Sequence, residues 1–108
     1  MQILRGEIYD VDLGIAYGHE QGGMRPCLIL QNDIGNKFSP TTIIAPITSQ
    51  HKKFGATHVD LDCLRKNSCI LLEQVRVVDT TRIKGFICKL DDAEMHNMRK
   101  KIMLTVGL

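Results

Sequence analysis

Residues 18–26 combine side-chain types that suit the binding of an anion. They read Gly-His-Glu-Gln-Gly-Gly-Met-Arg-Pro, and the two adjacent glycines let the backbone approach a ligand closely or adopt positive φ. Arg25 lies where this segment meets a predicted strand that begins at Pro26, whose fixed φ stiffens the junction. An arginine at a rigid junction suits bidentate contact with a phosphate or a carboxylate. On local sequence alone, a structural pairing of Arg25 with Glu20 is an equally good explanation.

A second group of polar side chains ends a predicted strand. Thr48, Ser49 and Gln50 follow a β-branched run, and hydroxyl and amide groups at a strand end can orient a phosphate oxygen or a base edge. The competing explanation is a local bond from side chain to backbone, which is the commoner role of such residues. His19 could act as a general base because an imidazole titrates near neutrality, whereas most lone loop histidines are simply solvated.

Two further segments carry weaker signals for nucleic-acid contact. Lys52 and Lys53 lie in a predicted loop over residues 50–56 and could follow a phosphate backbone, although such a pair usually only keeps a loop soluble. In a predicted strand over residues 69–79, Gln74 and Arg76 share one face. That face is either exposed to solvent or the wall of a groove, and the apolar residues before it favour the groove.

The cysteines do not suggest a metal site. Their spacings contain no CxxC pair and fit no zinc template; they are Cys27, Cys63, Cys69 and Cys88. Cys27 and Cys88 lie in apolar runs, where a thiol acts as a small core residue, and we expect all four to be reduced, structural thiols. The common nucleotide-binding, zinc-protease and serine-hydrolase motifs are absent, so no metal and no cofactor is expected.

Short strands and one helix must position these groups. The strand-like runs are residues 7–13, 26–30, 41–48, 57–61, 69–79 and 82–90. Pro46 restricts the third run to a sheet edge or a bulge, and residues 32–40 are a predicted loop. Asp91 and Glu94 form a capping-box pattern, with Met95, Met98 and Ile102 as an apolar stripe and Arg99, Lys100 and Lys101 toward the helix end. The pattern predicts a mainly β fold, a small antiparallel barrel with a packed C-terminal helix.

Length and composition set the class of protein. A chain of 108 residues has room for a single domain, residues 1–108. Its 44% apolar and 24% charged residues are those of a globular protein, and a net charge of +2 is too small to indicate a nucleic-acid binder by itself. The chain contains no apolar run of membrane-spanning length and no room for a signal peptide, so we expect a cytoplasmic protein.

Taken together, these segments resemble the MazF/PemK/Kid family of toxin endoribonucleases. The matching stretches cover the chain in order: RGEIY (5–9), GHEQGGMRP (18–26), QNDIGNKFSPT (31–41), PITS (46–49), THV (57–59), ILLEQVRVVD (70–79) and LDD (90–92). The resemblance implies an SH3-like β-barrel working as a homodimer. It also implies ribosome-independent, metal-independent cleavage of single-stranded RNA at short sequence motifs.

The resemblance also assigns roles to residues. The family's arginine and threonine correspond to Arg25 and Thr48, and the chemistry is attack of a ribose 2′-OH on the adjacent phosphate, leaving a 2′,3′-cyclic phosphate and a 5′-OH. In the Kid-like branch a histidine at the place of His19 is the base, with an acid at the place of Glu73. That branch has an arginine where this chain has Leu71, so His19 stays a possible base and the role of Glu73 is doubtful.

Several residues are predicted to contact RNA. They are Arg5, Tyr17, Glu20, Gln21, Gly22, Gly23, Ser49, Gln50, Lys52, Lys53, Gln74 and Arg76. Tyr17 and Phe54 are the loop aromatics best placed to stack on bases, while Tyr9 and Phe86 are expected in the core. His51 is a further candidate contact in the 50–56 loop. Because the loops that border the RNA groove differ from those of relatives, the cleavage motif is not carried over.

A family toxin implies a cognate antitoxin. Its disordered, acidic C-terminal segment would fold onto the toxin and compete with RNA for one basic surface. Two alternatives stay open at the level of sequence: a CcdB-like module that poisons a protein target without cutting RNA, and an inactive paralogue that only binds antitoxin. The Arg25 and Thr48 pair within the quoted motifs favours the nuclease.

Overall fold

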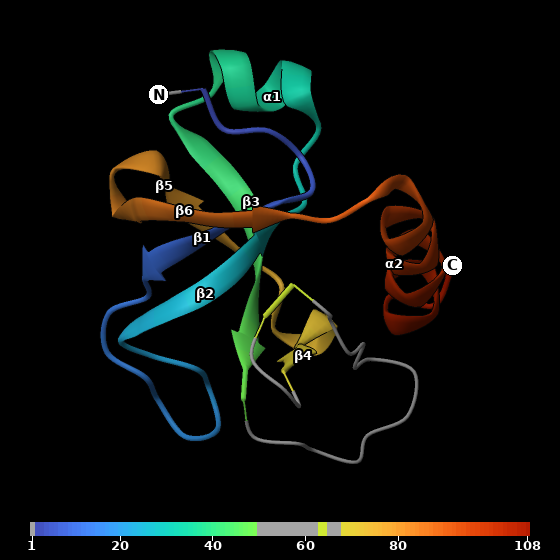
Figure 1. Cartoon of the computed structure of the whole chain (residues 1–108). Helices are drawn as coiled ribbons and strands as arrows, with labels where there is room; N and C mark the ends of the chain where they lie inside the picture. The colour runs from blue at the N-terminus through green and yellow to red at the C-terminus, as the bar shows by residue number, and fades with distance from the viewer. Residues whose placement is uncertain (1, 50–62, 65–67) are drawn as a thin grey trace.

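The computed structural model describes residues 2–49, 63, 64 and 68–108 (Figure 1). The elements in chain order are β1 (Glu7–Asp12), β2 (Met24–Ile29), α1 (Asp33–Phe38), β3 (Thr41–Thr48), β4 (Cys69–Ile70), the 3-10 turn η2 (Leu72–Gln74), β5 (Arg76–Asp79), the 3-10 turn η3 (Thr80–Arg82), β6 (Ile83–Lys89) and α2 (Asp92–Thr105). Neither α-helix in the described part is long and apolar enough to cross a membrane. The predicted run at residues 57–61 lies outside the described residues.

One curled antiparallel sheet forms the body of the fold. Its strands follow the order β4-β3-β2-β1-β6, and β5 pairs with the first half of β3. Over the residues described, hydrogen bonds do not close this path into a complete barrel. The prediction of a mainly β fold with a C-terminal helix is confirmed, and the sheet is barrel-like in its curl (Figure 1).

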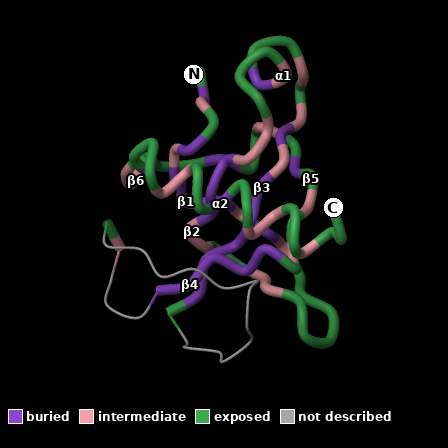
Figure 2. Tube along the Cα trace, turned by 90° about the vertical axis from the view of Figure 1, so that its right-hand side faces the viewer, coloured by how far each residue is buried: buried purple, intermediate pink, exposed green. Residues whose placement is uncertain are grey.

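Alternation along the strands divides the core into two clusters. In β1, Tyr9 and Val11 belong to one cluster while Ile8 belongs to the other, because successive side chains point to opposite faces. In β2, Cys27 and Ile29 belong to the first and Leu28 to the second. The part of β2 that falls in the predicted run at residues 26–30 is therefore buried on both faces from Cys27 to Ile29, as predicted. The buried stretches follow the strands through the centre of the molecule (Figure 2).

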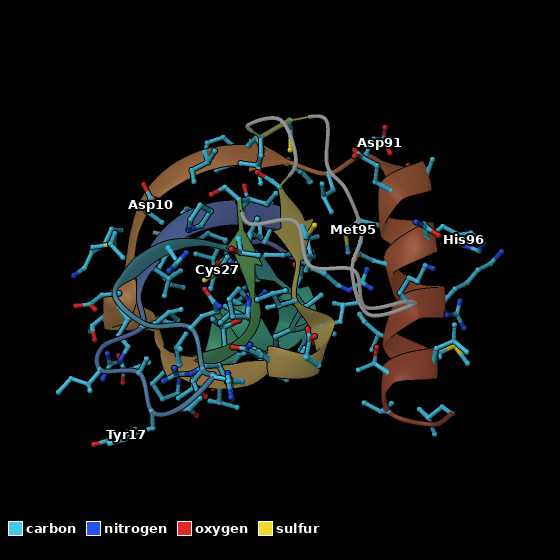
Figure 3. The ribbon with its side chains drawn as sticks, turned by 90° about the horizontal axis from the view of Figure 1, so that it is seen from below. Asp10, Tyr17, Cys27, Asp91, Met95 and His96 are labelled. Atoms are coloured by element: carbon cyan, nitrogen blue, oxygen red, sulfur yellow. The ribbon has the colours of Figure 1, made fainter. Side chains whose placement is uncertain are left out.

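Helix α2 covers the second cluster, and its start matches the prediction from sequence. Asp91 accepts a hydrogen bond from the Glu94 amide at 2.7 Å, and the Glu94 carboxylate accepts one from the Asp91 amide at 3.1 Å. Met98 is fully buried, and Met95 lies on the sheet side of the helix whereas His96 points away (Figure 3). The helix extends to Thr105, so the predicted cations lie before its last turn, which holds no basic residue.

The segment at residues 32–40 was predicted as a loop, and that prediction was wrong: it contains α1. The Asn32 side chain caps the helix by accepting from the Gly35 amide at 2.8 Å. Asn36 is buried, donates to the Gln31 carbonyl at 2.9 Å and accepts from the Thr42 hydroxyl at 2.7 Å. These bonds to Gln31 and to Thr42 of β3 stabilise a helix of six residues that lacks an apolar stripe.

The predicted long strand over residues 69–79 is also wrong, because η2 interrupts it. In η2 the Gln74 amide donates to the Leu71 carbonyl at 3.0 Å, and Leu72 turns into the core beneath α2. The break lets β4 pair with one end of β3 and β5 with the other. Gln74 therefore lies on a turn and Arg76 on β5, so the prediction that they share one face of a single strand does not hold.

Pro46 lies in a central strand, and not at the predicted edge or bulge. It pairs with Cys27 of β2 on one side. On the other side the partner of β3 changes, from β5 at residues 41–44 to β4 at residues 47 and 48. Pro46 falls between these two ladders, where its missing amide hydrogen breaks neither of them.

Phe86 corrects a further expectation from sequence. It was assigned to the core with Tyr9, and Tyr9 is indeed buried. Phe86 is 57% exposed and contacts Tyr9 only through an edge-to-face arrangement, with ring centroids 5.5 Å apart. It lies on β6, the last strand on its side of the described sheet.

Candidate active site

The loop that ends at β2 is closed at its base by backbone hydrogen bonds. The Gly23 amide donates to the Gly14 carbonyl at 2.8 Å, and the Leu13 amide donates to the Gly23 carbonyl at 2.9 Å. At Gly22 the two limbs approach so closely that a Cβ atom would lie 2.7 Å from the Ala16 Cβ. Gly22 therefore serves close packing within the loop, whereas Gly23 adopts a φ of +71° just before β2 begins.

Arg25 lies directly after this loop, and both of its neighbours restrict it. Its backbone is paired with Val11 of β1, and its Nε donates to the Gly22 carbonyl at 3.3 Å. The alternative predicted from sequence, a structural pairing of Arg25 with Glu20, is not observed. The Glu20 carboxylate accepts instead from the Tyr17 amide at 3.0 Å. The guanidinium of Arg25 is thus oriented by the loop carbonyl, and its remaining N–H groups can donate to a bound anion.

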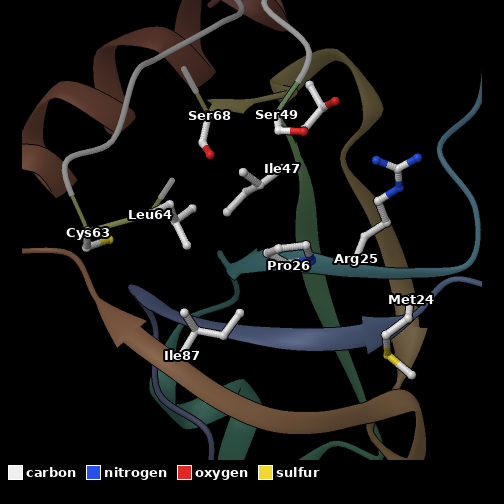
Figure 4. A pocket seen from close by; sticks show the side chains of 10 residues that line it. Met24, Arg25, Pro26, Ile47, Ser49, Cys63, Leu64, Ser68 and Ile87 are labelled. Atoms are coloured by element: carbon white, nitrogen blue, oxygen red, sulfur yellow. The ribbon is translucent and has the colours of Figure 1, made fainter. Parts of the chain in front are cut away.

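Arg25 and Thr48 line one cavity, although 22 residues separate them in the chain. The cavity holds about 480 Å³, within the range of small-molecule sites. Thr48 is 2% exposed at the end of β3, and Ser49 follows it into the cavity rim. Figure 4 shows Arg25 and Ser49 on one side of the cavity, with Cys63 and Leu64 on the other. The two residues singled out from sequence are therefore brought together.

A second cavity is lined by five of the twelve residues expected to contact RNA. Its volume is about 520 Å³. The predicted residues that line it are Tyr17, Glu20, Gln21, Gln74 and Arg76, together with the doubtful Glu73. Tyr17 is 75% exposed and projects from the loop (Figure 3). An exposed ring above a polar hollow suits stacking on an unpaired base.

Gln74 fastens the loop to η2. Its side-chain Oε1 accepts from the Gln21 amide at 2.8 Å, and its Nε2 donates to the His19 carbonyl at 3.2 Å. The Gln21 side-chain Oε1 is buried and accepts no hydrogen bond from the described residues. Gln74 thus has a positioning role that sequence reasoning, which assigned it only to RNA contact, did not identify.

Two guanidinium groups influence the buried thiol of Cys27. Burial raises the pKa of Cys27 to about 12, against the opposing effect of the positive charges of Arg76 and Arg25. Asp10 adds to the rise. Arg25 lines the first cavity and Arg76 the second, so each cavity has a guanidinium group in its lining. A phosphate backbone passing from one cavity to the other would meet both.

Other predicted residues lie away from the first cavity. His19 is exposed and lines neither cavity, although its carbonyl belongs to the Gln74 contact. Arg5 is exposed beside α2, where its amide donates to the Asp33 carboxylate at 2.6 Å. Four candidates in the 50–56 loop lie outside the described residues; they are Gln50, His51, Lys52 and Lys53. Phe54, the second stacking candidate, is also outside them.

Sequence reasoning missed one wall of the first cavity. Cys63, Leu64, Ser68 and Ile87 line it. Nothing in their types or spacing marks them, because they come from segments that meet Arg25 only in the folded chain. Within the residues described, no group of three or more His, Cys, Asp or Glu side chains is placed to hold a metal ion.

Residues 4–106 match the family described as PemK-like, MazF-like toxin of type II toxin-antitoxin system. Endoribonuclease EndoA of Bacillus subtilis is 44% identical over 113 aligned positions, covering 100% of this chain and 97% of the relative. Endoribonuclease MazF of Staphylococcus saprophyticus is 44% identical, covering 96% of this chain and 91% of the relative.

Solved structures share the fold. MazF from Deinococcus radiodurans superposes with a TM-score of 0.84 at 21% identity, covering 100% of this chain and 99% of that one. An endoribonuclease from a mycobacterial species, solved in complex with its cognate antitoxin, gives a TM-score of 0.79 at 20% identity and covers 99% and 95%.

Proposed function

The chain belongs to the family of PemK-like, MazF-like toxins of type II toxin–antitoxin systems, and we propose that the cavity beside Arg25 is where it cleaves RNA. Two relatives that match almost the whole chain at 44% identity are named endoribonucleases, so the chain is an endoribonuclease toxin. The observation that supports the location is the meeting of Arg25 and Thr48 in one cavity.

The proposed reaction is an internal transfer at one phosphate. The ribose 2′-oxygen attacks the adjacent phosphorus, the bond to the 5′-oxygen of the next nucleotide breaks, and a 2′,3′-cyclic phosphate and a 5′-OH remain. One proton leaves the 2′-hydroxyl and one joins the departing oxygen, so the step consumes no water and needs no metal. The negative charge that gathers on the five-coordinate phosphorus must be stabilised within the site.

Arg25 provides that stabilisation in our proposal. Its Nε is used by the Gly22 carbonyl, which leaves the Nη groups to bind the two non-bridging phosphate oxygens as a fork. Since its backbone is paired in the sheet, the guanidinium does not have to be reorganised when charge develops. Thr48, almost fully buried beneath the cavity, orients a phosphate oxygen or the ribose through its hydroxyl.

His19 is the residue whose proposed part in proton transfer is weakest. It lies on the exposed part of the loop and lines neither cavity. Its ring would have to reach the 2′-hydroxyl of an RNA strand that lies over the loop. Replacement of His19 by Ala decides the question, because an unchanged dependence of cleavage rate on pH would remove it from catalysis.

We propose that single-stranded RNA runs across the loop from one cavity to the other. The reacting phosphate lies beside Arg25, and flanking nucleotides enter the second cavity, where Tyr17 is exposed and Arg76 adds positive charge. Polar groups of Gln21 and Glu20 line the same hollow and can read base edges. The reaction takes place in the cytoplasm, where messenger RNA is found.

The partners follow from the family. A toxin of a type II system is held by a cognate antitoxin, and the mycobacterial relative was solved with its antitoxin bound. We propose that an acidic segment of the antitoxin occupies the surface of Arg25 and Arg76 and excludes RNA. We also propose that the active form is a homodimer. The CcdB-like alternative receives no support from the family match or from either relative.

Cleavage of a long single-stranded RNA by the purified chain in EDTA tests the function. We expect discrete fragments with 2′,3′-cyclic phosphate ends, since the reaction uses no metal. Arg25→Ala should lower kcat by about 100- to 1,000-fold, which is the typical loss when one donor to a developing anion is removed. Arg99→Ala, an exposed arginine on α2 that contacts neither cavity, is the matched control and should cleave like the parent. Intact RNA with the parent protein, or full activity of Arg25→Ala, would refute the assignment.

A further inference from the structure

Two cysteines that the proposed reaction does not use lie side by side at the wall of the first cavity. The Cys88 thiol donates to the Cys63 sulfur, with the two Sγ atoms 2.7 Å apart. Cys88 lies on β6 and Cys63 is 25 residues away in sequence, so only the fold brings them together. A disulfide bond is about 2.05 Å long, so a shift of roughly 0.7 Å would join the sulfurs.

The two sulfurs differ in access to solvent. Cys63 is exposed and Cys88 is half-buried against the core beneath α2. Burial, the hydrogen bond to Cys63 and the charge of Glu94 raise the pKa of Cys88 to about 12. A dissolved oxidant therefore reaches Cys63 first, and the adjacent Cys88 is the thiol that would react with the oxidised Cys63. This is the usual arrangement of a reactive cysteine with a resolving partner.

The remaining cysteines differ from this pair. Cys27 and Cys69 are 0% and 1% exposed and lie within the sheet. They act as small core residues, as the sequence predicts for Cys27. The same expectation does not describe Cys63 and Cys88, whose sulfurs face each other outside the core.

We infer that Cys63 and Cys88 form a reversible, oxidant-sensitive disulfide that restrains one wall of the RNA-cleavage cavity. Cys63 and Leu64 line the wall opposite Arg25, and Ile87, the neighbour of Cys88, lines the cavity below them in the view of Figure 4. The bridge ties this wall to β6, so the cavity cannot widen on that side. RNA then binds less tightly, while Arg25 and Thr48 keep their places. This consequence rests on the proposed function of the cavity, whereas formation of the bridge does not.

The oxidant is a peroxide, and the steps balance. The Cys63 thiolate attacks one oxygen of hydrogen peroxide, the O–O bond breaks, and a sulfenic acid and hydroxide form. The Cys88 sulfur then attacks the Cys63 sulfur, the S–S bond forms and the S–O bond breaks. The hydroxyl of the sulfenic acid leaves with the proton of the Cys88 thiol as water. Two thiols are oxidised and one peroxide is reduced to two waters. A dithiol reductant reverses the change by exchange.

The bridge is tested on the full chain by mass spectrometry before any RNA is added. After treatment with hydrogen peroxide and digestion by trypsin without reductant, the peptide of residues 54–65 should be linked to that of residues 85–89. The link should vanish with dithiothreitol and be absent from Cys63→Ser and Cys88→Ser. The melting temperature should rise by several degrees in the bridged parent only, since the bridge closes a loop of the unfolded chain. Failure to link, links to Cys27 or Cys69, or links between two chains would overturn the inference.

The effect on cleavage is measured with the same samples. The bridged parent should show a several-fold higher KM for RNA with kcat little changed, and dithiothreitol should restore the reduced value. Both serine variants should cleave RNA equally with and without peroxide. A bridged protein with unchanged KM would overturn the regulatory inference. Intact RNA with the reduced parent would instead refute the proposed function, and the linked peptide would still be detected.

Discussion

The side chain of Gln74 holds the backbone of Gln21 across 53 residues of sequence, with Oε1 accepting from the Gln21 amide at 2.8 Å. The Nε2 atom of the Gln74 side chain donates to the His19 carbonyl at 3.2 Å. One side chain therefore pairs with two backbone groups of the loop that leads into Arg25. Hydrogen bonds within the loop close its base and join Tyr17 to Glu20, whereas this contact fixes its outer part against η2.

Gln74→Ala should free the outer loop and lower kcat/KM by roughly tenfold, because each lost hydrogen bond to the loop is worth about 1 kcal/mol. The melting temperature should also fall by several degrees, because both hydrogen bonds are lost from the folded state. Gln74→Glu keeps the acceptor for Gln21 but places an anion beside the His19 carbonyl, and it should fall between parent and alanine variant. Gln2→Ala removes an exposed glutamine far from the loop and serves as the control. Parent-like kinetics for Gln74→Ala would show that the loop needs no such contact.

Gly22→Ala should distort the loop at its narrowest point. A Cβ atom there would lie 2.7 Å from the Ala16 Cβ and 3.0 Å from the Gly14 carbonyl oxygen. We expect a loss of about 1–3 kcal/mol in the free energy of unfolding, measured in urea, together with reduced cleavage. Gly85→Ala is the matched control, because a Cβ atom at that position meets nothing within 4 Å. Equal stability of the two variants would contradict the close packing.

Local signals in the sequence predicted the parts of the fold that depend on neighbouring residues. The capping box of Asp91 and Glu94 needs residues three apart, and both of its hydrogen bonds are present. The continuous apolar residues after Pro26 predict a buried strand, and they form one. The loop before Arg25 follows from its glycines.

Features that depend on distant residues were not predictable in the same way. Helix α1 is stabilised by Asn36, whose partners include Thr42 on the next strand. The break at η2 arises because two different parts of β3 pair with β4 and with β5, at residues 47–48 and 41–44. For the site, the resemblance to a family identified Arg25 and Thr48, but the wall formed by Cys63 and Leu64 carries no local signal. Exposure of Phe86 likewise depends on β6 lying last on its side of the described sheet.

Asp91→Ala should weaken the start of α2. It removes the acceptor for the Glu94 amide, and loss of an N-cap costs about 1 kcal/mol. In a chain of this size such a loss lowers the melting temperature by about 4–8 °C. Asp92→Ala, one residue later in the first turn, removes a charge but no cap and should have a smaller effect. Calorimetry of both variants gives the comparison, and a larger effect at Asp92 would contradict the capping box.

Alkaline pH should destabilise the protein through Cys27. Burial raises the pKa of this thiol from 9.0 to about 12. The positive charges of Arg76 and Arg25 lower the pKa, but by too little to offset the effect of burial. The folded protein therefore prefers the neutral thiol. Its contribution to stability is fully present below pH 9 and is lost as pH rises toward about 12. The urea midpoint of the parent should thus fall between neutral pH and about pH 10.

Cys27→Ala should reduce that fall, because the variant has no buried thiol to ionise. Tyr9, whose pKa is raised from 10.0 to about 12 by burial and by its bond to Glu7, adds to the loss mainly above pH 10 and is unchanged in the variant. Cys88, whose pKa burial and the contact with Cys63 raise to about 12, also adds to the loss and is unchanged in the variant. If Cys27→Ala and the parent lose equal stability over this pH interval, the alkaline sensitivity does not come from the thiol that Arg25 and Arg76 face. It would then have to come from the other groups that titrate in the interval.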